Sequence, residues 1–227
     1  MAEMKPIICR IPSIVDKEKF MNCVAVAADL LKRGGIIAIP TDTIYGIAAL
    51  AQSIDSVERL YKIKGREHNK PIAICVGELN DIPKWGKVDC PIGLISALLP
   101  GPVTLLFNRH HNLNPLLNPD GKLVGIRIPD HSFVRALAKE CNEPIALTSA
   151  NVSGSLSTLS IEEFSELWPL LDGVFDGGRI VDTPEARKGS TIVDLSLPGA
   201  YKIIREGSAY KKSRATIENF GLIQEAI

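Results

Sequence analysis

The sequence lacks an excess of charge of either sign, has few aromatic side chains and contains no long apolar run. Lysine and arginine together number 26, aspartate and glutamate together number 26, and the formal net charge is zero. Proteins that coat nucleic acids usually carry a basic excess and aromatic side chains for base stacking, whereas aromatics make up only 5% of this chain. No apolar run approaches the length of a membrane span. These absences argue against a general nucleic-acid coat and predict no stable membrane insertion, and they leave room for a local basic patch.

Cysteine is scarce and irregularly spaced. The five cysteines are odd in number, and none of them forms a C-x-x-C pair. This pattern disfavours a disulfide framework or a zinc site and favours a reducing compartment. The first residues, MAEMKPIICRIP, lack the apolar core of a signal peptide and the Arg/Ser-rich pattern of an organellar targeting segment. We therefore expect a cytoplasmic protein, with an organellar pool as the alternative.

Several familiar catalytic motifs are also missing. The chain contains no G-x-x-x-x-G-K-[ST], G-x-G-x-x-G, H-E-x-x-H or G-x-S-x-G sequence. The adjacent His110 and His111 fall in an Asn/Pro-rich stretch, 108–121, where a solvated pair is a simpler interpretation than a metal site. We therefore predict no metal-ligating side chains.

Short apolar runs typical of buried strands alternate with helical patterns along the chain. The strand candidates are 35–41, 71–76, 103–107, 123–129, 144–149, 190–195 and 201–205, and the helical stretches are 17–33, 55–64, 91–99, 131–141 and 161–168. Most of the strand candidates are continuously apolar, which is typical of strands covered on both faces. The alternation predicts an α/β fold, and one domain with a short tail is the simplest organisation.

Polar and charged residues stand at or near the ends of several predicted strands. They are Thr41, Asp42 and Thr43 after the first strand, Thr148, Ser149 and Asn151 after a later one, and Arg127 and Arg205 near the ends of two more. In open α/β sheets ligands bind outside the carboxyl ends of strands, so these residues together indicate a shared site. The alternative is that the Thr, Asp and Ser residues only cap the turns and helices that follow.

The segment KIKGREHNKP, 62–71, concentrates cations before a buried strand. We expect the preceding helix to be capped by Asp55 and to end at Gly65 in the left-handed conformation. Lys64 and Arg66 flank that end, where cations also stabilise a helix without any ligand. Their number favours a site for phosphate or carboxylate oxygens. With the hydroxyl-rich stretches 147–157 and 190–191, they predict a site for an anionic substrate.

Seven motifs occur in a fixed order along most of the chain. They are PTDTIYG (40–46), KIKGREHNKPIAICV (62–76), LLPGPVTL (98–105), GIRIPD (125–130), LTSANVSG (147–154), GSTIVDL (189–195) and IIREG (203–207). In this order and spacing the sequence resembles the YrdC-like family of threonylcarbamoyl-adenylate synthases, most closely its single-domain eukaryotic members. The resemblance implies a single-domain, twisted open mixed α/β sheet with flanking helices around a positively charged cavity. It also implies a catalytic domain at 14–207 and a C-terminal tail at 208–227 with helical character.

The resemblance implies a reaction as well. L-threonine, bicarbonate or carbon dioxide, and ATP with Mg²⁺ would give threonylcarbamoyl-adenylate and pyrophosphate, the first step of N6-threonylcarbamoyladenosine formation in tRNA. A separate transferase complex would then move the threonylcarbamoyl group onto the tRNA. Because no covalent enzyme intermediate is needed, catalysis would come from positioning and charge stabilisation, which suits a site rich in cations and hydroxyls.

Roles for individual residues follow from the matched motifs. Lys64 and Arg66 would be catalytic and hold triphosphate or carbamate oxygens. The implied threonine-binding residues are Thr43, Cys75, Arg127, Thr148 and Ser190, with Arg127 clamping the carboxylate. The implied ATP-binding residues are Arg66, Asn69, Thr104, Ser149, Asn151, Ser157 and Arg205. Two positions depart from the family pattern: Cys75 stands where many bacterial relatives have His, and either Ser157 or Thr158 would supply a distal hydroxyl.

Two other functions fit part of the sequence. A module that binds tRNA or double-stranded RNA without ATP turnover could use the cluster Lys62, Lys64, Arg66 and Lys70, although zero net charge and few aromatics argue against it. An enzyme that binds ATP and carbamoylates an acceptor other than threonine is the second alternative.

Overall fold

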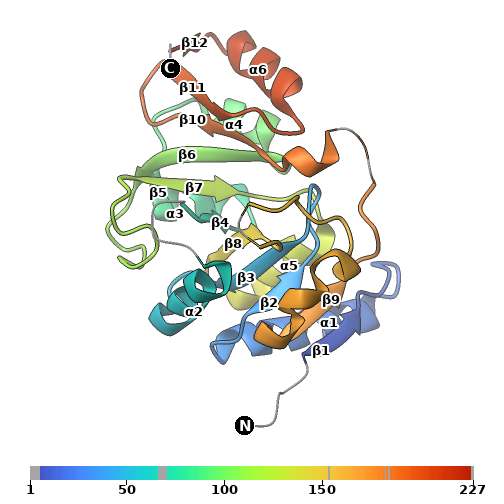
Figure 1. The fold of residues 1–227 in the computed structure, drawn as a ribbon. Helices are drawn as coiled ribbons and strands as arrows, with labels where there is room; N and C mark the ends of the chain where they lie inside the picture. The colour runs from blue at the N-terminus through green and yellow to red at the C-terminus, as the bar shows by residue number, and fades with distance from the viewer. Residues whose placement is uncertain (1–5, 66–70, 153, 182, 184, 226–227) are drawn as a thin grey trace.

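The computed structural model describes residues 6–65, 71–152, 154–181, 183 and 185–225 (Figure 1). Its α-helices are α1 (Lys17–Lys32), α2 (Ile54–Lys64), α3 (Ile82–Trp85), α4 (Ile92–Leu98), α5 (Ser132–Cys141) and α6 (Tyr210–Asn219). Short 3-10 helices are η1 (Leu79–Asp81), η2 (Ile161–Leu170) and η3 (Ala186–Lys188). The strands are β1 (Ile7–Arg10), β2 (Ile37–Ile39), β3 (Gly46–Leu50), β4 (Ala73–Cys75), β5 (Gly86–Lys87), β6 (Val103–Arg109), β7 (Leu123–Arg127), β8 (Ile145–Ser149), β9 (Gly173–Asp176), β10 (Thr191–Asp194), β11 (Ala200–Arg205) and β12 (Ile223–Gln224). No helix in these described ranges is both long enough and apolar enough to cross a membrane.

One mixed sheet runs through the molecule. Its strand order is β1-β9-β2-β3-β8-β4-β7-β6-β10-β11-β12, and β5 pairs with β6. Parallel pairs such as β4 with β7 and β6 with β10 alternate with antiparallel pairs such as β4 with β8 and β6 with β7. This topology confirms the predicted single-domain α/β class with an open mixed sheet and flanking helices. Because neighbouring antiparallel strands run in opposite directions, their carboxyl ends do not meet at one edge.

Helices cover both faces of the sheet, which explains the continuously apolar strands. In β2, Ile37 and Ile39 pack into the core formed with α1 and α5, while Ala38 between them packs into the core on the other face. Helices α1 and α5 pack against each other on the first face, and α4 packs against α6 near the other end of the sheet (Figure 1). Both faces of these strands are therefore apolar because each face packs into its own core.

The cover provided by α1 and α5 is incomplete. Their core takes side chains from β2, β3, β4, β8 and β9, and in the described residues it takes none from β6, β7, β10 or β11. On those strands Leu105 and Ile126 pack into the core on the other face. Their neighbours Thr104 and Arg127 therefore project from the face that α1 and α5 leave uncovered. The site described below lies on this uncovered part.

All seven predicted strands are present, several of them shorter than predicted. The helical stretches 17–33, 55–64, 91–99 and 131–141 correspond to α1, α2, α4 and α5. The stretch 161–168 forms the 3-10 helix η2 instead of an α-helix, since its backbone leaves helical geometry at Phe164 and it contains Pro169. The sequence patterns missed β1, β3, β5, β9 and β12.

Helix α2 begins differently from the prediction and ends as predicted. Its cap is Ser53, which adopts an extended backbone and accepts a hydrogen bond from the Ser56 backbone amide (3.3 Å). Asp55, predicted as the cap, lies in the first turn, where a carboxylate interacts favourably with the helix dipole. Gly65 ends the helix in the left-handed conformation, with φ of 54°.

The segment expected as a C-terminal tail contacts the rest of the fold. Helix α6 packs against α4, and β12 pairs with β11. Ile217 and Leu222 are buried in the same core cluster as the central strands. The described residues of this segment therefore contribute to the core. Strand β1, which precedes residue 14, extends the sheet by pairing with β9, but its residues are mostly exposed.

Candidate active site

A small cavity of about 140 Å³ opens on the uncovered face of the sheet. Its lining residues come from the β2–β3 turn and from β4, β6, β7, β8, β10 and β11: Thr41, Ile44, Tyr45, Gly46, Pro71, Ala73, Cys75, Thr104, Arg127, Leu147, Thr148, Ser149, Ser190, Ile192 and Arg205. Seven of the predicted site residues line it: Cys75, Thr104, Arg127, Thr148, Ser149, Ser190 and Arg205.

The cavity lies on a sheet face, and this corrects the expectation of a shared carboxyl edge. Several lining residues are direct partners across strands: Cys75 pairs with Arg127, and Ile192 pairs with both Thr104 and Arg205. Strands β7 and β8 run in opposite directions, so the polar residues at their ends meet through the face of the sheet. The prediction that these residues share a site assumed that the strands are parallel and end at one edge. The residues do lie together, but across the face of a mixed sheet.

Arg127 is buried in the cavity wall with only part of its guanidinium satisfied. The residue is 6% exposed, and its Nη2 donates to a carboxylate oxygen of Asp42 and to the Thr43 hydroxyl (2.8 Å). The other Asp42 oxygen accepts from the Asp130 backbone amide (2.9 Å), which fixes the carboxylate. The Arg127 Nε is buried and has no hydrogen-bond partner in the described part of the chain. A buried donor of this kind is costly unless a ligand oxygen satisfies it.

A second guanidinium faces Arg127 from the end of β11. Arg205 Nε and Nη2 donate to the Ser190 carbonyl oxygen (3.1 and 2.8 Å), and Nη2 also reaches the Ser190 hydroxyl (3.2 Å). That hydroxyl is 2.8 Å from the Thr104 hydroxyl. Burial lowers the pKa of Arg205, and the charge of Arg127 lowers it further. Two cations and a group of hydroxyls therefore share one small space, which suits an anionic ligand.

Lys64 organises the loop after β8. It is 2% exposed, and its Nζ donates to the backbone carbonyl oxygens of Ser149 (2.7 Å) and Asn151 and to Asn151 Oδ1 (3.2 Å). The Asn151 Nδ2 in turn donates to the Ser155 carbonyl oxygen (2.5 Å). Lys64 thus holds together the backbone of a loop that carries predicted nucleotide contacts. The expectation that it only stabilises a helix terminus does not fit its burial.

Two of the remaining predicted residues, Arg66 and Asn69, lie outside the described residues. The others are described but do not line the cavity. Ser157 is partly buried, and its carbonyl oxygen accepts from Arg187 Nη1 (2.6 Å). Thr158 is buried, and its hydroxyl donates to the Ala150 carbonyl oxygen (2.9 Å). Thr158 therefore has a role within the loop, which leaves Ser157 as the better candidate for the distal hydroxyl.

The PTDTIYG turn divides its polar groups between two tasks. The Thr41 hydroxyl accepts from the backbone amides of Thr43 (3.1 Å) and Ile44 (3.2 Å), as in a local turn cap. Asp42 and Thr43 contact Arg127 instead. The sequence placed Asp42 among the polar residues of a shared site but did not predict its contact with Arg127. The signal that could have found it is the presence of an Arg in a buried strand, because such a cation requires a carboxylate partner.

Cys75 contributes a neutral thiol to the cavity. It is buried beside Arg127, and burial raises the pKa of the thiol to about 12, although the charge of Arg127 acts in the opposite direction. A thiol with a raised pKa is a poor nucleophile. Among the described residues no cluster of three or more His, Cys, Asp or Glu side chains could hold a metal ion.

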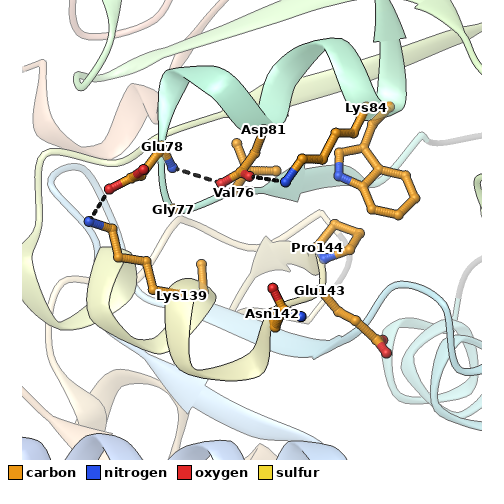
Figure 2. A pocket seen from close by; sticks show the side chains of 11 residues that line it. Val76, Gly77, Glu78, Asp81, Lys84, Lys139, Asn142, Glu143 and Pro144 are labelled. Carbon is orange, nitrogen blue, oxygen red and sulfur yellow. Dashed lines mark hydrogen bonds and ion pairs between the residues drawn. The ribbon is translucent and has the colours of Figure 1, made fainter.

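A larger groove of about 280 Å³ lies between η1, α3 and α5 (Figure 2). Both cations among its described lining residues are in ion pairs: Lys139 contacts Glu78, and Lys84 contacts Asp81 at 2.7 Å, while Glu143 adds a further carboxylate to the lining. The described lining contains none of the predicted site residues. Since its lysines are already paired and these lining residues include one more carboxylate than cations, this groove is a weaker candidate for binding an anion than the cavity around Arg127.

The fold and the cavity define an α/β protein with a small site for an anionic ligand, lined by guanidinium and hydroxyl groups. Comparison with known proteins identifies the family. The model of the Sua5/YciO/YrdC family, described as "telomere recombination", matches residues 29–207. This chain belongs to the Sua5/YciO/YrdC family.

Relatives within the family carry a functional name. A bovine protein named threonylcarbamoyl-AMP synthase is 48% identical over 195 residues, which cover 85% of this chain and 71% of the relative. A human protein of the same name is 48% identical over 196 residues, covering 85% and 70%. The crystal structure of Pyrococcus abyssi Sua5 complexed with L-threonine has a TM-score of 0.79 at 25% identity, and the match covers 96% of this chain and 62% of that chain. This chain therefore spans less than two thirds of the archaeal protein's length.

Proposed function

We propose that this chain is an L-threonylcarbamoyl-adenylate synthase. It joins L-threonine and bicarbonate or carbon dioxide to the AMP portion of ATP and releases pyrophosphate. Support comes from relatives of that name at 48% identity and from the likeness to a Sua5 structure that contains L-threonine. The observation that carries the proposal is the buried Arg127, whose unpartnered Nε requires an acceptor in a cavity that Arg205 and several hydroxyls also line.

In this proposal the threonine carboxylate binds Arg127. A guanidinium presents donors in a planar fork that matches a carboxylate, and the Asp42 contact fixes its orientation. Thr148 and Ser190 also line this cavity, and their polar groups would contact the amino acid. Thr43 acts from behind Arg127 by accepting from its Nη2.

The chemistry requires positioning more than a reactive side chain. The threonine amine attacks carbon dioxide and loses a proton, or condenses with bicarbonate and releases water, and either route gives a carbamate. A carbamate oxygen then attacks the α-phosphorus of ATP while the bond to pyrophosphate breaks. Preorganised cations stabilise the charge that develops on the phosphate oxygens. The neutral Cys75 thiol is compatible with a route that has no covalent enzyme intermediate.

ATP occupies the side of the cavity formed by Thr104, Arg205 and the loop from Ser149 to Ser157 in this proposal. Arg205 faces the triphosphate, and Lys64 keeps the loop in position through the carbonyl oxygens of Ser149 and Asn151. Arg66 and Asn69 would add contacts from the segment that follows α2. Mg²⁺ enters with ATP, and phosphate oxygens and water supply its ligands.

The product is a reactive mixed anhydride and needs an acceptor. A transferase complex that moves the threonylcarbamoyl group onto an adenosine of tRNA would consume it, which makes that complex and tRNA the expected partners. RNA binding without ATP turnover is the competing function.

Pyrophosphate release from ATP tests the proposal. We expect release only when threonine and bicarbonate are both present, and serine or valine in place of threonine should give a much lower rate. Release without either substrate would indicate another ATP-cleaving activity and would contradict the proposal. No release, together with tight and steeply salt-dependent RNA binding, would favour the binding module.

A further inference from the structure

Glu163 forms the densest cluster of charged contacts in the described part of the chain outside the cavity. It lies in η2, and its carboxylate accepts from Arg179 Nη1 (2.9 Å), from Arg187 Nη1 (2.8 Å) and Nη2 (3.2 Å), and from the Leu159 backbone amide (3.0 Å). The two Arg187 contacts form a two-pronged pair, which is the strongest geometry for such ions. Neither the proposed reaction nor the motifs assign this carboxylate a role.

The contacts of Glu163 join two segments that lie far apart in the sequence. Arg187 also donates to the Ser157 carbonyl oxygen (2.6 Å), and the Ile180 amide donates to the Leu159 carbonyl oxygen (2.8 Å). The loop after β8 is thereby tied to the segment that leads into β10. Both segments carry residues of the candidate site: Ser149 and Asn151 on the first, and Ser190 on the second.

The second segment reaches the cavity within a few residues of Arg187. Helix η3 ends at Lys188, and Gly189 follows with φ of +66°. A Cβ at Gly189 would lie 3.3 Å from Arg205 Nη2 and 3.6 Å from the Ile44 side chain, two residues that line the cavity. A displacement of Arg187 would therefore be expected to shift Gly189 and, with it, Ser190 and its contact with Arg205.

We propose that Glu163 is a positioning residue for ATP: through Arg187 it holds the loop after β8 and the approach to Ser190 at the separation that the nucleotide requires. This inference rests on the proposed function. Glu163 acts through Arg187 and touches no substrate. The cluster is partly exposed, with the Glu163 side chain 26% and the Arg187 side chain 28% accessible, so its contribution to global stability is modest.

The electrostatic environment keeps Glu163 ionised under assay conditions. The hydrogen bond from Arg187 is the main cause that lowers the pKa of its carboxyl group to about 2. The ion pairs are therefore intact at every pH at which the enzyme would be assayed. Substitution of Glu163 therefore removes a charge that is present throughout the assay range.

Glu163→Gln is the decisive variant, because it keeps the size of the side chain and removes the charge. We expect the KM for ATP to rise about fivefold or more, the KM for threonine to change less, and kcat to stay within about twofold. Glu78→Gln is the control for loss of a surface carboxylate, since Glu78 forms a single, more exposed ion pair with Lys139 in the groove of Figure 2. Equal ATP KM values in the two variants would overturn the inference.

A binding measurement separates this inference from the proposed function. Calorimetry with α,β-methylene ATP reports nucleotide affinity without turnover. A Kd that is higher for Glu163→Gln than for Glu78→Gln supports the positioning role even if the wild-type chain releases no pyrophosphate, a result that would defeat only the proposed reaction. Equal Kd values, or no binding by the wild type, overturn the inference. Arg187→Lys keeps the charge but loses the two-pronged contact, and it should shift the Kd in the same direction.

Discussion

At the scale of single residues, Arg127 most strongly restricts what the cavity can bind. A guanidinium in so buried a position is costly unless a carboxylate and hydrogen-bond acceptors compensate it. Asp42 and Thr43 accept hydrogen bonds from Nη2, and Nε has no hydrogen-bond partner among the described residues. A carboxylate of the ligand would accept a hydrogen bond from Nε and so compensate the remaining buried donor. The cavity should therefore distinguish an amino acid from its amide.

Thr43→Val tests whether the PTDTIYG turn belongs to the site. The substitution keeps the volume of the side chain and removes the acceptor for Arg127 Nη2. Loss of one hydrogen bond to a charged group corresponds to about a tenfold rise in the KM for threonine. The measurement is the KM for threonine at saturating ATP, with the melting temperature recorded alongside.

Thr191→Val is the matched control for that change. Its hydroxyl is buried without a hydrogen-bond partner in the described residues, so the same atom is removed without breaking a bond. We expect its stability to be unchanged or slightly higher. If Thr43→Val lowered the melting temperature and left the threonine KM unaltered, the turn would have only a structural role.

At the scale of elements, the end of β11 is packed against the start of β10 more closely than any side chain would permit. A Cβ at Gly207 would lie 2.3 Å from the carbonyl carbon of Ser190 and 2.3 Å from the amide nitrogen of Thr191. Both obstructing atoms belong to the backbone, so neither can rotate away. The absence of a side chain at residue 207 therefore sets the position of Ser190 relative to Arg205.

Gly207→Ala should move these two strand ends apart. We expect it to raise the KM of both threonine and ATP about tenfold, since overpacking of this kind costs on the order of 1–3 kcal/mol. Gly199→Ala is the control: its φ of +73° makes alanine unfavourable, but no atom lies near its Cβ position. Similar KM values for the two alanine variants, at similar melting temperatures, would show that general destabilisation accounts for the effect.

The sequence was a good guide to elements whose pattern is local. Continuous apolar runs predicted seven strands, since a strand covered on both faces needs apolar residues at successive positions. Strand β3 was missed because GIAAL is rich in small residues and only the polar motif at 40–46 separates it from β2. Helix η2 was predicted as α-helical because its apolar spacing does not reveal the kink at Phe164.

The candidate site was predictable in its residues and not in its geometry. Seven predicted residues line one cavity, yet the direction of β8 relative to β4 and β7 cannot be read from an apolar run. The contact between Asp42 and Arg127 spans 85 positions in the chain, and that between Glu163 and Arg187 spans 24. Such pairs depend on the tertiary fold, and spacing along the chain does not encode them.

At the scale of the whole molecule, the chain beyond residue 207 is part of the packed structure. Helix α6 closes one end of the sheet through Ile217, which is fully buried, and Phe220 packs near Gly93 of α4. A domain that ended at residue 207 would expose the apolar surface of α4. Its stability should therefore depend on a segment in which no site residue is predicted.

Ile217→Ala tests this dependence. Truncation of a buried isoleucine should lower the free energy of unfolding by about 2–5 kcal/mol, because the side chain's burial is lost and a cavity is left under α6. Ile223→Ala is the control on the same segment, since Ile223 is 74% exposed and its truncation should change stability by less than about 0.5 kcal/mol. Chemical denaturation followed by circular dichroism gives both values. At a temperature where both variants are folded, the KM values should match those of the wild type, because α6 supports the sheet from the face opposite the cavity.

Equal unfolding midpoints for the two variants would mean that α6 is not packed on the sheet in solution, and the catalytic domain would then end where the motifs end.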